Sequence, residues 1–315
     1  MTSTPPPFSP GSISIRLYAH DELSPPDTIR ELCYQAWLAT EHGFDGVMTS
    51  EHHGGLPGYL PNPLQLTSFI LDDTDGGWAA PCPLVLPLRP AAMVAEEIAW
   101  LDARHPGRVG LGVAAGALPL DFDVAGVSQH DAVDRFKTEL PRLVSMLRGV
   151  DLGELKGDPA LVACRLDPVP VLSAAVSVAA ARRAAHCGAG ILMEGMSTPA
   201  RLARLTAAFS ESGGTGDKVL IRRVWLGRVP SELVTRQRAV YESYAGPGDG
   251  FDEDQTIASH DPAEMAERLA ATVAESGADS LNLRVQLPGM APEEVREQIV
   301  RIGTTVVGLV KSRWR

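Results

Sequence analysis

A carboxylate and two imidazoles stand side by side in the sequence at Glu51, His52 and His53. Imidazole titrates near neutral pH, so a histidine beside a carboxylate is suited to taking up and releasing protons. The residues from 54 to 63 are rich in glycine and proline, which predicts a loop. The short apolar run Asp45–Thr49 ahead of them is typical of a strand. The sequence therefore predicts acid/base chemistry in a loop that follows a strand, which is where α/β enzymes carry catalytic side chains.

The segments that must position this loop alternate between strand-like and helix-like patterns. Strands are predicted at Ile13–Ala19, Asp45–Thr49, Cys82–Leu86, Val109–Ala114, Val169–Ala174, Gly190–Met193, Val219–Val229 and Ser280–Val285. Helices are predicted at Asp27–His42, Pro63–Leu71, Ala91–Ala103, Asp131–Leu147, Val178–Cys187, Pro199–Glu211, Ser231–Tyr244, Asp261–Ser276 and Pro292–Lys311. Strands that alternate with helices in this way predict an α/β fold, a (β/α)8 TIM barrel, with a doubly wound open sheet as the alternative.

The same pattern predicts the domain organisation. We expect a disordered tail at residues 1–12, which are rich in proline and serine, and a single barrel domain with short insertions at residues 13–315. Irregular stretches are predicted at 54–61, 115–127, 149–167 and 246–259. Gly110, Gly112 and Gly116 miss the spacing of a dinucleotide-binding fingerprint by one residue at the third glycine, and they indicate a tight barrel strand that runs into a loop.

Charge and cysteine content exclude several classes of protein. The formal net charge of −11 over 315 residues argues against binding to nucleic acid or to an anionic membrane. No signal peptide is visible, and no apolar run reaches the roughly 20 residues that span a bilayer. The four cysteines lie far apart without a CxxC spacing. We therefore expect no disulfide framework, no metal site and a reducing, cytoplasmic environment.

Seven segments occur in an order that resembles the luciferase-like flavin-dependent monooxygenase family, which includes the bacterial luciferase alpha subunit. They are Ser50–His53, Leu60–Pro63, Leu84–Pro90, Ala95–Asp102, Gly107–Val113, Gly277–Arg284 and Pro288–Met290. The resemblance extends from about residue 13 to about residue 310.

The resemblance implies a (β/α)8 barrel that binds reduced FMN at the carboxyl ends of its strands, and a homodimer. In the family's monooxygenases a separate flavin reductase supplies the reduced FMN, and O2 forms a flavin hydroperoxide. One oxygen atom then passes to a small-molecule substrate and the other leaves as water. A related branch uses a deazaflavin and transfers only hydride, so a deazaflavin-dependent oxidoreductase is an alternative. A non-catalytic barrel that binds a ligand is the alternative of another class.

His52 matches the histidine of the family's active site. This match implies that His52 is the general acid/base and that Glu51 holds or polarises it. The alternative is that Glu51, His52 and His53 only hydrogen-bond their own loop. Asp121 falls at the family's Asp-Phe position after the fourth strand, which implies that it orients the substrate or an edge of the flavin. A helix cap or a surface carboxylate is the alternative for Asp121.

The resemblance also assigns residues to the flavin. Cys82–Pro83 falls where the luciferase has a cis peptide bond against the flavin ring, so we expect a cis bond beside the isoalloxazine. An ordinary trans proline at a strand start is the alternative. Val176 and Ser177 precede the helix whose start holds the flavin phosphate in the family. Ser177 is alternatively a simple N-cap.

The phosphate site departs from the family pattern at Ala114 and Ala115, which stand where the luciferase alpha subunit has the arginine that holds the phosphate. Loss of a charge-assisted contact removes about 1.5–3 kcal/mol. Three explanations fit: the flavin binds weakly and transiently, Arg222 or Arg223 replaces the missing arginine, or flavin binding has been lost.

The substrate pocket is expected to contain seven residues. They are His53, Tyr59, Leu60, Phe122, Val124, Trp225 and Gln286. Most are apolar or aromatic, which predicts an uncharged, partly apolar substrate in a compact pocket.

Overall fold

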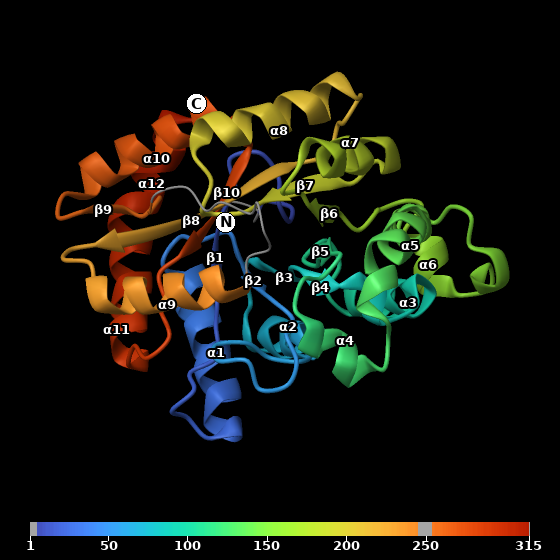
Figure 1. The fold of residues 1–315 in the computed structure, drawn as a ribbon, viewed down its shortest axis with the longest axis horizontal. Coiled ribbons are helices and arrows are strands. Elements are labelled where there is room, and N and C mark those ends of the chain that lie inside the picture. Colours follow the sequence, from blue (N-terminus) through green and yellow to red (C-terminus); the bar gives the residue numbers. More distant parts are fainter. Residues whose placement is uncertain (1–4, 245–253, 315) are drawn as a thin grey trace.

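Parallel strands form a ring at the centre of the molecule, and helices cover its outer face (Figure 1). The computed structural model describes residues 5–244 and 254–314. The strands are β1 (Ile13–Arg16), β2 (Gly46–Thr49), β3 (Trp78–Pro81), β4 (Leu84–Val85), β5 (Leu111–Ala114), β6 (Val171–Ala174), β7 (Gly190–Met193), β8 (Lys218–Leu226), β9 (Ile257–Ser259) and β10 (Ser280–Arg284). The α-helices are α1 (Pro25–Glu41), α2 (Pro63–Asp73), α3 (Ala91–Arg104), α4 (Pro119–Ala125), α5 (Ala132–Met146), α6 (Pro159–Ala163), α7 (Val178–Cys187), α8 (Pro199–Glu211), α9 (Ser231–Tyr244), α10 (Pro262–Ser276), α11 (Pro292–Ile302) and α12 (Gly308–Arg313).

β3 and β4 together occupy a single strand position in the ring. The strands follow one another in the order β3, β2, β1, β10, β8, β7, β6, β5 and β4. β3 pairs with β2, and β4 pairs with β5. A parallel bridge between Ala79 and Val109 joins β3 to the segment just ahead of β5. β3 and β4 are therefore two halves of one barrel strand, and the predicted (β/α)8 barrel is confirmed.

Four elements lie where the sequence predicted none. β3 precedes the predicted third strand, and α4, α6 and β9 fall within predicted irregular stretches. β9 extends the sheet by pairing with the far end of β8. Each of these elements has seven residues or fewer, and so short a segment carries too little periodicity to be told from a loop.

Polar caps fix where several helices begin. The side chains of Ser177, Thr198 and Asp261 accept hydrogen bonds from first-turn amides of α7, α8 and α10, which satisfies donors that lack a partner within the helix. α7 and α10 end at Gly188 and Gly277, which adopt left-handed φ angles of 76° and 69°. Because each helix returns the chain to the amino end of the next strand, the loops that follow the strands gather at the carboxyl end of the barrel.

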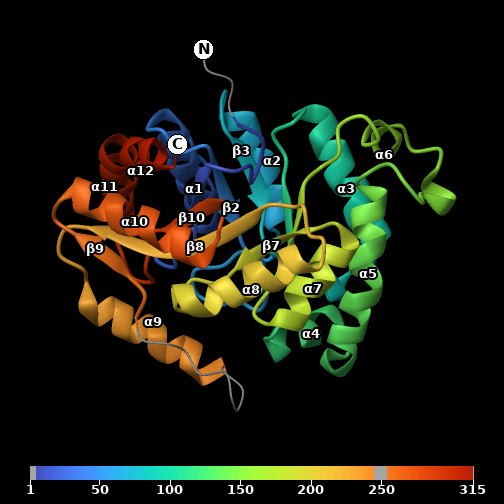
Figure 2. The ribbon, with the colours of Figure 1, turned by 90° about the horizontal axis from the view of Figure 1, so that it is seen from above.

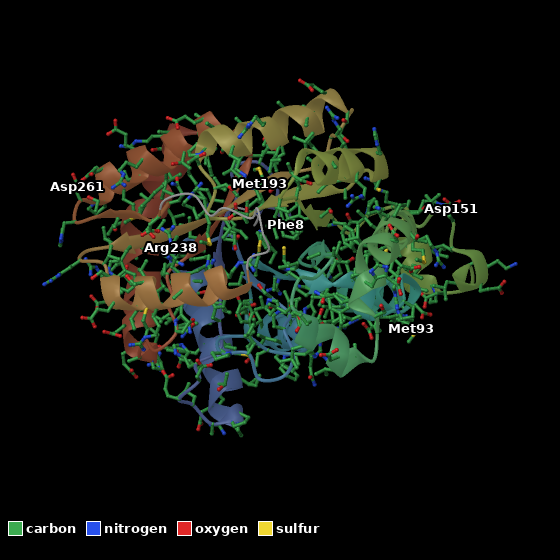
Figure 3. The ribbon with its side chains drawn as sticks, in the orientation of Figure 1. Phe8, Met93, Asp151, Met193, Arg238 and Asp261 are labelled. Carbon is green, nitrogen blue, oxygen red and sulfur yellow. The ribbon has the colours of Figure 1, made fainter. Side chains whose placement is uncertain are left out.

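Residues 5–12 are ordered, where we expected disorder. Phe8 is fully buried, and its ring meets the Trp78 ring edge-on with the centroids 5.1 Å apart. Figure 3 labels Phe8 near the middle of the molecule. A carbon built on Gly110 would lie 2.6 Å from the Phe8 ring, so this glycine makes room for it. The prediction of disorder was wrong for residues 5–12, because burial of one large aromatic side chain offsets much of the entropy lost by so short a segment.

The barrel interior is tightly packed below its carboxyl end. Met48, Trp78, Cys82 and Leu192 belong to one buried cluster there together with Phe8. A carbon built on Gly112 would lie 2.1 Å from the Cys82 sulfur, which agrees with the tightly packed strand that the sequence predicted. The interior therefore has a solid floor, and any ligand must bind above it, among the loops at the carboxyl end.

Candidate active site

The residues singled out for chemistry gather at the carboxyl end of the barrel. Glu51, His52 and His53 follow β2, and Asp121 lies in the first turn of α4, which follows β5. In Figure 2, α4 and α9 lie at the opposite end of the molecule from the amino-terminal segment. The candidate site is therefore at the end of the barrel that this segment does not close.

His52 and Asp121 form a hydrogen-bonded pair. The Nδ1 atom of His52 lies 2.9 Å from the Oδ2 atom of Asp121, and the amide of His53 donates to the Oδ1 atom of Asp121 at 2.7 Å. The Asp121 side chain has 1% of its surface exposed, whereas 23% of the His52 side chain is exposed. Asp121 thus holds both the loop and one ring nitrogen of His52. The other ring nitrogen, Nε2, has no hydrogen-bond partner among the described residues.

The charge on Asp121 sets the tautomer of His52. Burial acts to raise the pKa of Asp121, but the hydrogen bonds from His52 and from the His53 amide outweigh it and hold this pKa below its ordinary value. An ionised carboxylate only accepts hydrogen bonds, so the Nδ1 atom of His52 donates to it. In the neutral ring, the Nε2 atom then presents a lone pair. This geometry makes Nε2 the atom of His52 that can accept and return a proton.

Glu51 forms a second group with different partners. Its Oε2 atom accepts from the Val85 amide at 2.5 Å. Its Oε1 atom accepts from the guanidinium of Arg89 and lies 3.2 Å from the Nε2 atom of His53. The Glu51 side chain is fully buried. Burial raises the pKa of Glu51, against the opposing effects of Arg89, the Val85 amide and His53.

The expectation that Glu51 holds His52 was wrong. A parallel bridge between Glu51 and Leu60 shows that the chain is extended at Glu51, and successive side chains of an extended chain point to opposite sides. Glu51 and His53 therefore share one side, while His52 points to the other side and meets Asp121. Asp121 takes the position that we had assigned to Glu51.

Replacement of Arg89 by glutamine is expected to lower the free energy of unfolding by about 1.5–3 kcal/mol, because the buried Glu51 carboxylate loses its charged donor. The Val85 amide and His53 still satisfy Glu51, which keeps the loss below that of an unpaired buried charge. Urea unfolding measures the change. As a control, Arg104→Gln removes a side chain that is 73% exposed, and its effect should stay below about 1 kcal/mol. Equal stability of Arg89→Gln and Arg104→Gln would contradict the buried ion pair.

The Cys82–Pro83 peptide bond is cis, as predicted. Arg16 donates from Nη1 to the Cys82 carbonyl at 2.7 Å, and the Glu51 amide donates to the Pro83 carbonyl at 3.1 Å. Arg16 also donates to Ser50 and to Asn282. These contacts fasten the peptide to β1 and to the first residue of the His52 loop. The placement of a flavin ring against it stays a prediction.

The start of α7 offers backbone amides and little charge. Ser177 caps the helix by accepting from the Ala180 amide at 3.3 Å, and Val176 is 63% exposed. Ala114 and Ala115 lie half-buried at the end of β5. The expected N-cap is therefore present at Ser177. An anion at this helix start would meet free amides and the helix dipole.

Arg222 and Arg223, the suggested replacements for the missing phosphate-binding arginine, form hydrogen bonds with other elements. Arg222 is almost fully buried and donates to the carbonyls of Gly195 and Ser197, in the loop ahead of α8. Burial lowers the pKa of Arg222 to about 10. Arg223 donates to the Gln237 side chain on α9. These contacts argue against replacement of the missing arginine by Arg222 or Arg223.

A small pocket is lined by Tyr18, Ala19, Pro57, Gly58, Tyr59, Gln237, Gln286 and Pro288. The His52 ring meets the Tyr59 ring edge-on with the centroids 4.5 Å apart, and Tyr59 meets Tyr18 in the same way at 5.4 Å. Two of the predicted pocket residues, Tyr59 and Gln286, thus line this pocket, and the Tyr59 ring separates it from His52.

Three other predicted pocket residues lie elsewhere. Phe122 is fully buried in a cluster with Val85 and Ala132. Val124 is 57% exposed, and Trp225 packs against the main core where β8 pairs with β9. The sequence could not separate these roles, because the unpredicted helix α4 turns Asp121, Phe122 and Val124 toward different surroundings.

Sequence reasoning missed Arg16, Tyr18, Arg89 and Arg284. A signal for Arg16 was present, because the alternation in β1 buries Ile13 and Ile15 in the core outside the ring and turns Arg16 inward. Arg89 gave no signal, since its partner Glu51 lies 38 residues away.

The chain belongs to the luciferase-like monooxygenase family, whose model matches residues 11–306. The alkanal monooxygenase alpha chain of Photorhabdus laumondii is 27% identical over 115 residues, which cover 36% of this chain and 32% of that one. The chain spans 61% of the length of one curated relative and about a third of the length of others.

Solved structures of flavin and deazaflavin proteins share the fold. The oxygenating constituent of 3,6-diketocamphane monooxygenase from Pseudomonas putida, in complex with FMN, matches with a TM-score of 0.73 and 17% identity over 95% of this chain and 98% of that one. An F420-dependent secondary alcohol dehydrogenase matches with a TM-score of 0.72 and 19% identity, again over 95% and 98%. At these identities the likeness shows the barrel fold.

The described residues contain neither a membrane-spanning helix nor a metal-binding cluster. Within residues 5–244 and 254–314, no helix has the length and apolar character needed to cross a membrane. In the same residues, no group of three or more His, Cys, Asp or Glu side chains is arranged to hold a metal ion.

Proposed function

We propose that this protein is a flavin-dependent oxidoreductase, and specifically a two-component monooxygenase. It would take reduced FMN from a separate flavin reductase and transfer one oxygen atom of O2 to a small organic substrate. The observation that carries the proposal is the His52–Asp121 pair, in which a buried carboxylate holds one nitrogen of an imidazole that is 23% exposed. Such a pair serves reactions that need proton transfer at a fixed atom.

The residues around the pair fit a flat redox ring. The carboxyl ends of β5 and β6 carry the small, half-buried side chains Ala114 and Ala174. The amides at the start of α7 suit the phosphate, and the Cys82–Pro83 peptide suits one ring face. When bound there, the reduced flavin would supply electrons to O2.

The protein's own residues have separable parts in this proposal. The Nε2 atom of His52 accepts or returns a proton, and Asp121 holds the ring in the tautomer that leaves Nε2 available. Tyr18 and Tyr59 pack edge-on beside His52 and limit access of water. Glu51 and Arg89 anchor the loop.

A deazaflavin-dependent hydride transfer is the second candidate. It is favoured by the shared fold with the F420-dependent alcohol dehydrogenase. A non-catalytic ligand-binding barrel is the third candidate, of a different class, and the absence of an arginine at Ala114 and Ala115 favours it.

As further proposals, the protein is a cytoplasmic homodimer, and it contacts the flavin reductase only transiently.

The purified protein should be titrated anaerobically with FMN, reduced FMN and F420 while its melting temperature is followed. Reduced FMN is expected to stabilise it most, by about 2.7 kcal/mol when the ligand is at a hundred times its Kd. A larger shift with F420 would support hydride transfer instead. If no flavin shifts the melting temperature, the non-catalytic barrel is the better description.

A further inference from the structure

Arg16 carries a positive charge inside the barrel. It is the last residue of β1 and is 3% exposed. Ile13 and Ile15 of the same strand belong to the core outside the ring, so the alternating Arg16 side chain points to the interior. Its Nη2 atom lies 3.8 Å from the sulfur of Met48, which belongs to the buried cluster of the barrel floor. The guanidinium therefore lies beside this floor, at the carboxyl end of β1.

The hydrogen-bond partners of Arg16 among the described residues are neutral. Its Nε atom donates to the amide oxygen of Asn282 at 2.8 Å. Its Nη1 atom donates to the Ser50 hydroxyl and to the Cys82 carbonyl. No carboxylate of the described residues forms an ion pair with Arg16. The guanidinium is thus a buried cation that is held by dipoles alone.

Two other arginines that contact buried groups have carboxylate partners. Arg89 donates to Glu51, and Arg296 donates to Glu31 through two of its nitrogens. The Arg89 and Arg296 side chains are 24% and 33% exposed, so Arg16 is more buried than either. Burial of a charge is unfavourable unless a group of opposite charge accompanies it. An anionic group bound near Arg16 would supply the compensation that its neighbours do not.

The contacts around Arg16 hold the cation without neutralising it. Burial raises the pKa of the Cys82 thiol to about 12, against the opposing effect of Arg16, so this thiol stays neutral near neutral pH. The Asn282 amide is fixed by a second hydrogen bond, in which its Nδ2 atom donates to the Ser14 hydroxyl at 2.9 Å. This bond directs the amide oxygen of Asn282 to Arg16. The positive charge therefore has a fixed position.

Arg16 and the expected phosphate position lie on opposite sides of the ring. The phosphate is expected at the start of α7, which follows β6. From β1, the strands β10, β8 and β7 come before β6 in one direction, and β2, the joined β3 and β4, and β5 come before it in the other. A flavin that spans the mouth from α7 therefore has its ring, and not its phosphate, on the Arg16 side. The phosphate carries the same charge in both redox states, so the start of α7 cannot distinguish them.

We propose that Arg16 makes the site selective for reduced flavin over oxidised flavin, an inference that rests on the proposed flavin-dependent function. Near neutral pH the reduced flavin ring is an anion, whereas the oxidised ring is neutral. A fixed cation near the ring stabilises the anion selectively. The Nε and Nη1 donors of Arg16 are used within the protein, so Arg16 acts through its charge. Such selectivity suits a protein that takes reduced FMN from a reductase and must release the oxidised form.

Anaerobic calorimetric titration of the full chain with oxidised and reduced riboflavin tests the proposal, because riboflavin has no phosphate. The measured quantity is the ratio of the two Kd values. The original protein is expected to bind reduced riboflavin about tenfold or more tightly, and Arg16→Gln should lower this preference about tenfold. A tenfold change is equivalent to a fall of about 30 mV in the reduction potential of the bound flavin. Arg16→Lys should retain most of the preference, because it keeps the charge.

Asn282→Asp provides a second test that leaves Arg16 in place. It sets a carboxylate where the amide oxygen accepts from Arg16 at 2.8 Å, and so neutralises the cation. The preference for reduced riboflavin should fall as in Arg16→Gln, whereas a purely structural role of Arg16 predicts no change. Arg104→Gln, at a side chain that is 73% exposed, is the control and should leave the ratio unchanged. The melting temperature of each variant reports whether it is folded.

Three results would overturn the proposal. The first is equal binding of oxidised and reduced riboflavin by the original protein. The second is a ratio that stays unchanged in both Arg16→Gln and Asn282→Asp. The third is a loss of FMN affinity in Arg16→Gln that is equal for both redox states and absent with riboflavin, which would assign Arg16 to the phosphate. Each of these results leaves flavin binding itself intact. If the original protein binds neither FMN nor riboflavin in either redox state, the proposed FMN-dependent function fails together with this inference.

Discussion

Replacement of His52 by alanine is expected to lower kcat/KM by about a hundredfold to ten-thousandfold, the usual contribution of a positioned general acid/base. The measurement is turnover with reduced FMN, O2 and a small organic substrate identified by product analysis. The effect should appear in the proton-transfer step, because Asp121 holds the Nδ1 atom of His52 and leaves the Nε2 atom to exchange a proton. Flavin affinity should change little, since the expected phosphate position at Ser177 follows a different strand.

His260→Ala provides the matched control for this change. His260 is exposed and lies ahead of α10, outside the candidate site, so its loss should leave turnover within about twofold of the original value. A His52→Ala variant with full turnover would remove His52 from the mechanism. A variant with weakened flavin binding and normal turnover at saturation would instead make His52 a cofactor contact.

The fold could be predicted from the sequence because its signals are local. Period-2 and period-3.6 patterns recur along the chain, and helix ends such as Gly188 and Gly277 are marked by residues that adopt left-handed angles. Where the signal was not local, the prediction failed. Phe8 is ordered by its contact with Trp78, which lies 70 positions later in the chain, and no pattern within residues 1–12 records that contact.

The residues of the candidate site were singled out from the sequence, but their hydrogen-bond partners were predicted wrongly. His52, Glu51 and Asp121 were all singled out, but neighbours in sequence were assumed to be partners in space. In an extended segment, adjacent side chains diverge, so Glu51 pairs with His53 while His52 reaches a carboxylate 69 residues away. Contacts between neighbouring strands escaped prediction for a related reason. The pairing of Arg284 with Arg223 depends on the register of β10 against β8, which single-strand patterns do not contain.

Asp121→Asn separates the two functions that the structure gives to this carboxylate. An amide has a donor group where Asp121 has only acceptors, so it can donate to the Nδ1 atom of His52 and move the ring proton to Nε2. We expect kcat to fall by about a hundredfold to ten-thousandfold, as when the orienting aspartate of a serine protease triad is replaced by asparagine. The backbone contact to His53 can survive, because the amide oxygen still accepts. A variant with unchanged kcat would show that the orientation of His52 is not needed for turnover.

The pH dependence of stability supplies an independent readout for the same variant. The pKa of Asp121 is lowered in the folded state, below the ordinary carboxyl value of about 3.9. The unfolded state therefore takes up the proton first as the pH falls, and the native state is destabilised relative to it. This contribution to the free energy of unfolding is fully present above about pH 5 and is lost as the pH falls through the lowered pKa of the folded state. Asp121→Asn has no such proton to bind, so its stability should fall less steeply than that of the original protein between about pH 5 and pH 2. If the free energy of unfolding fell equally steeply with pH in both proteins, the His52–Asp121 hydrogen bond would not favour the ionised carboxylate. The tautomer assigned to His52 would then lose its basis.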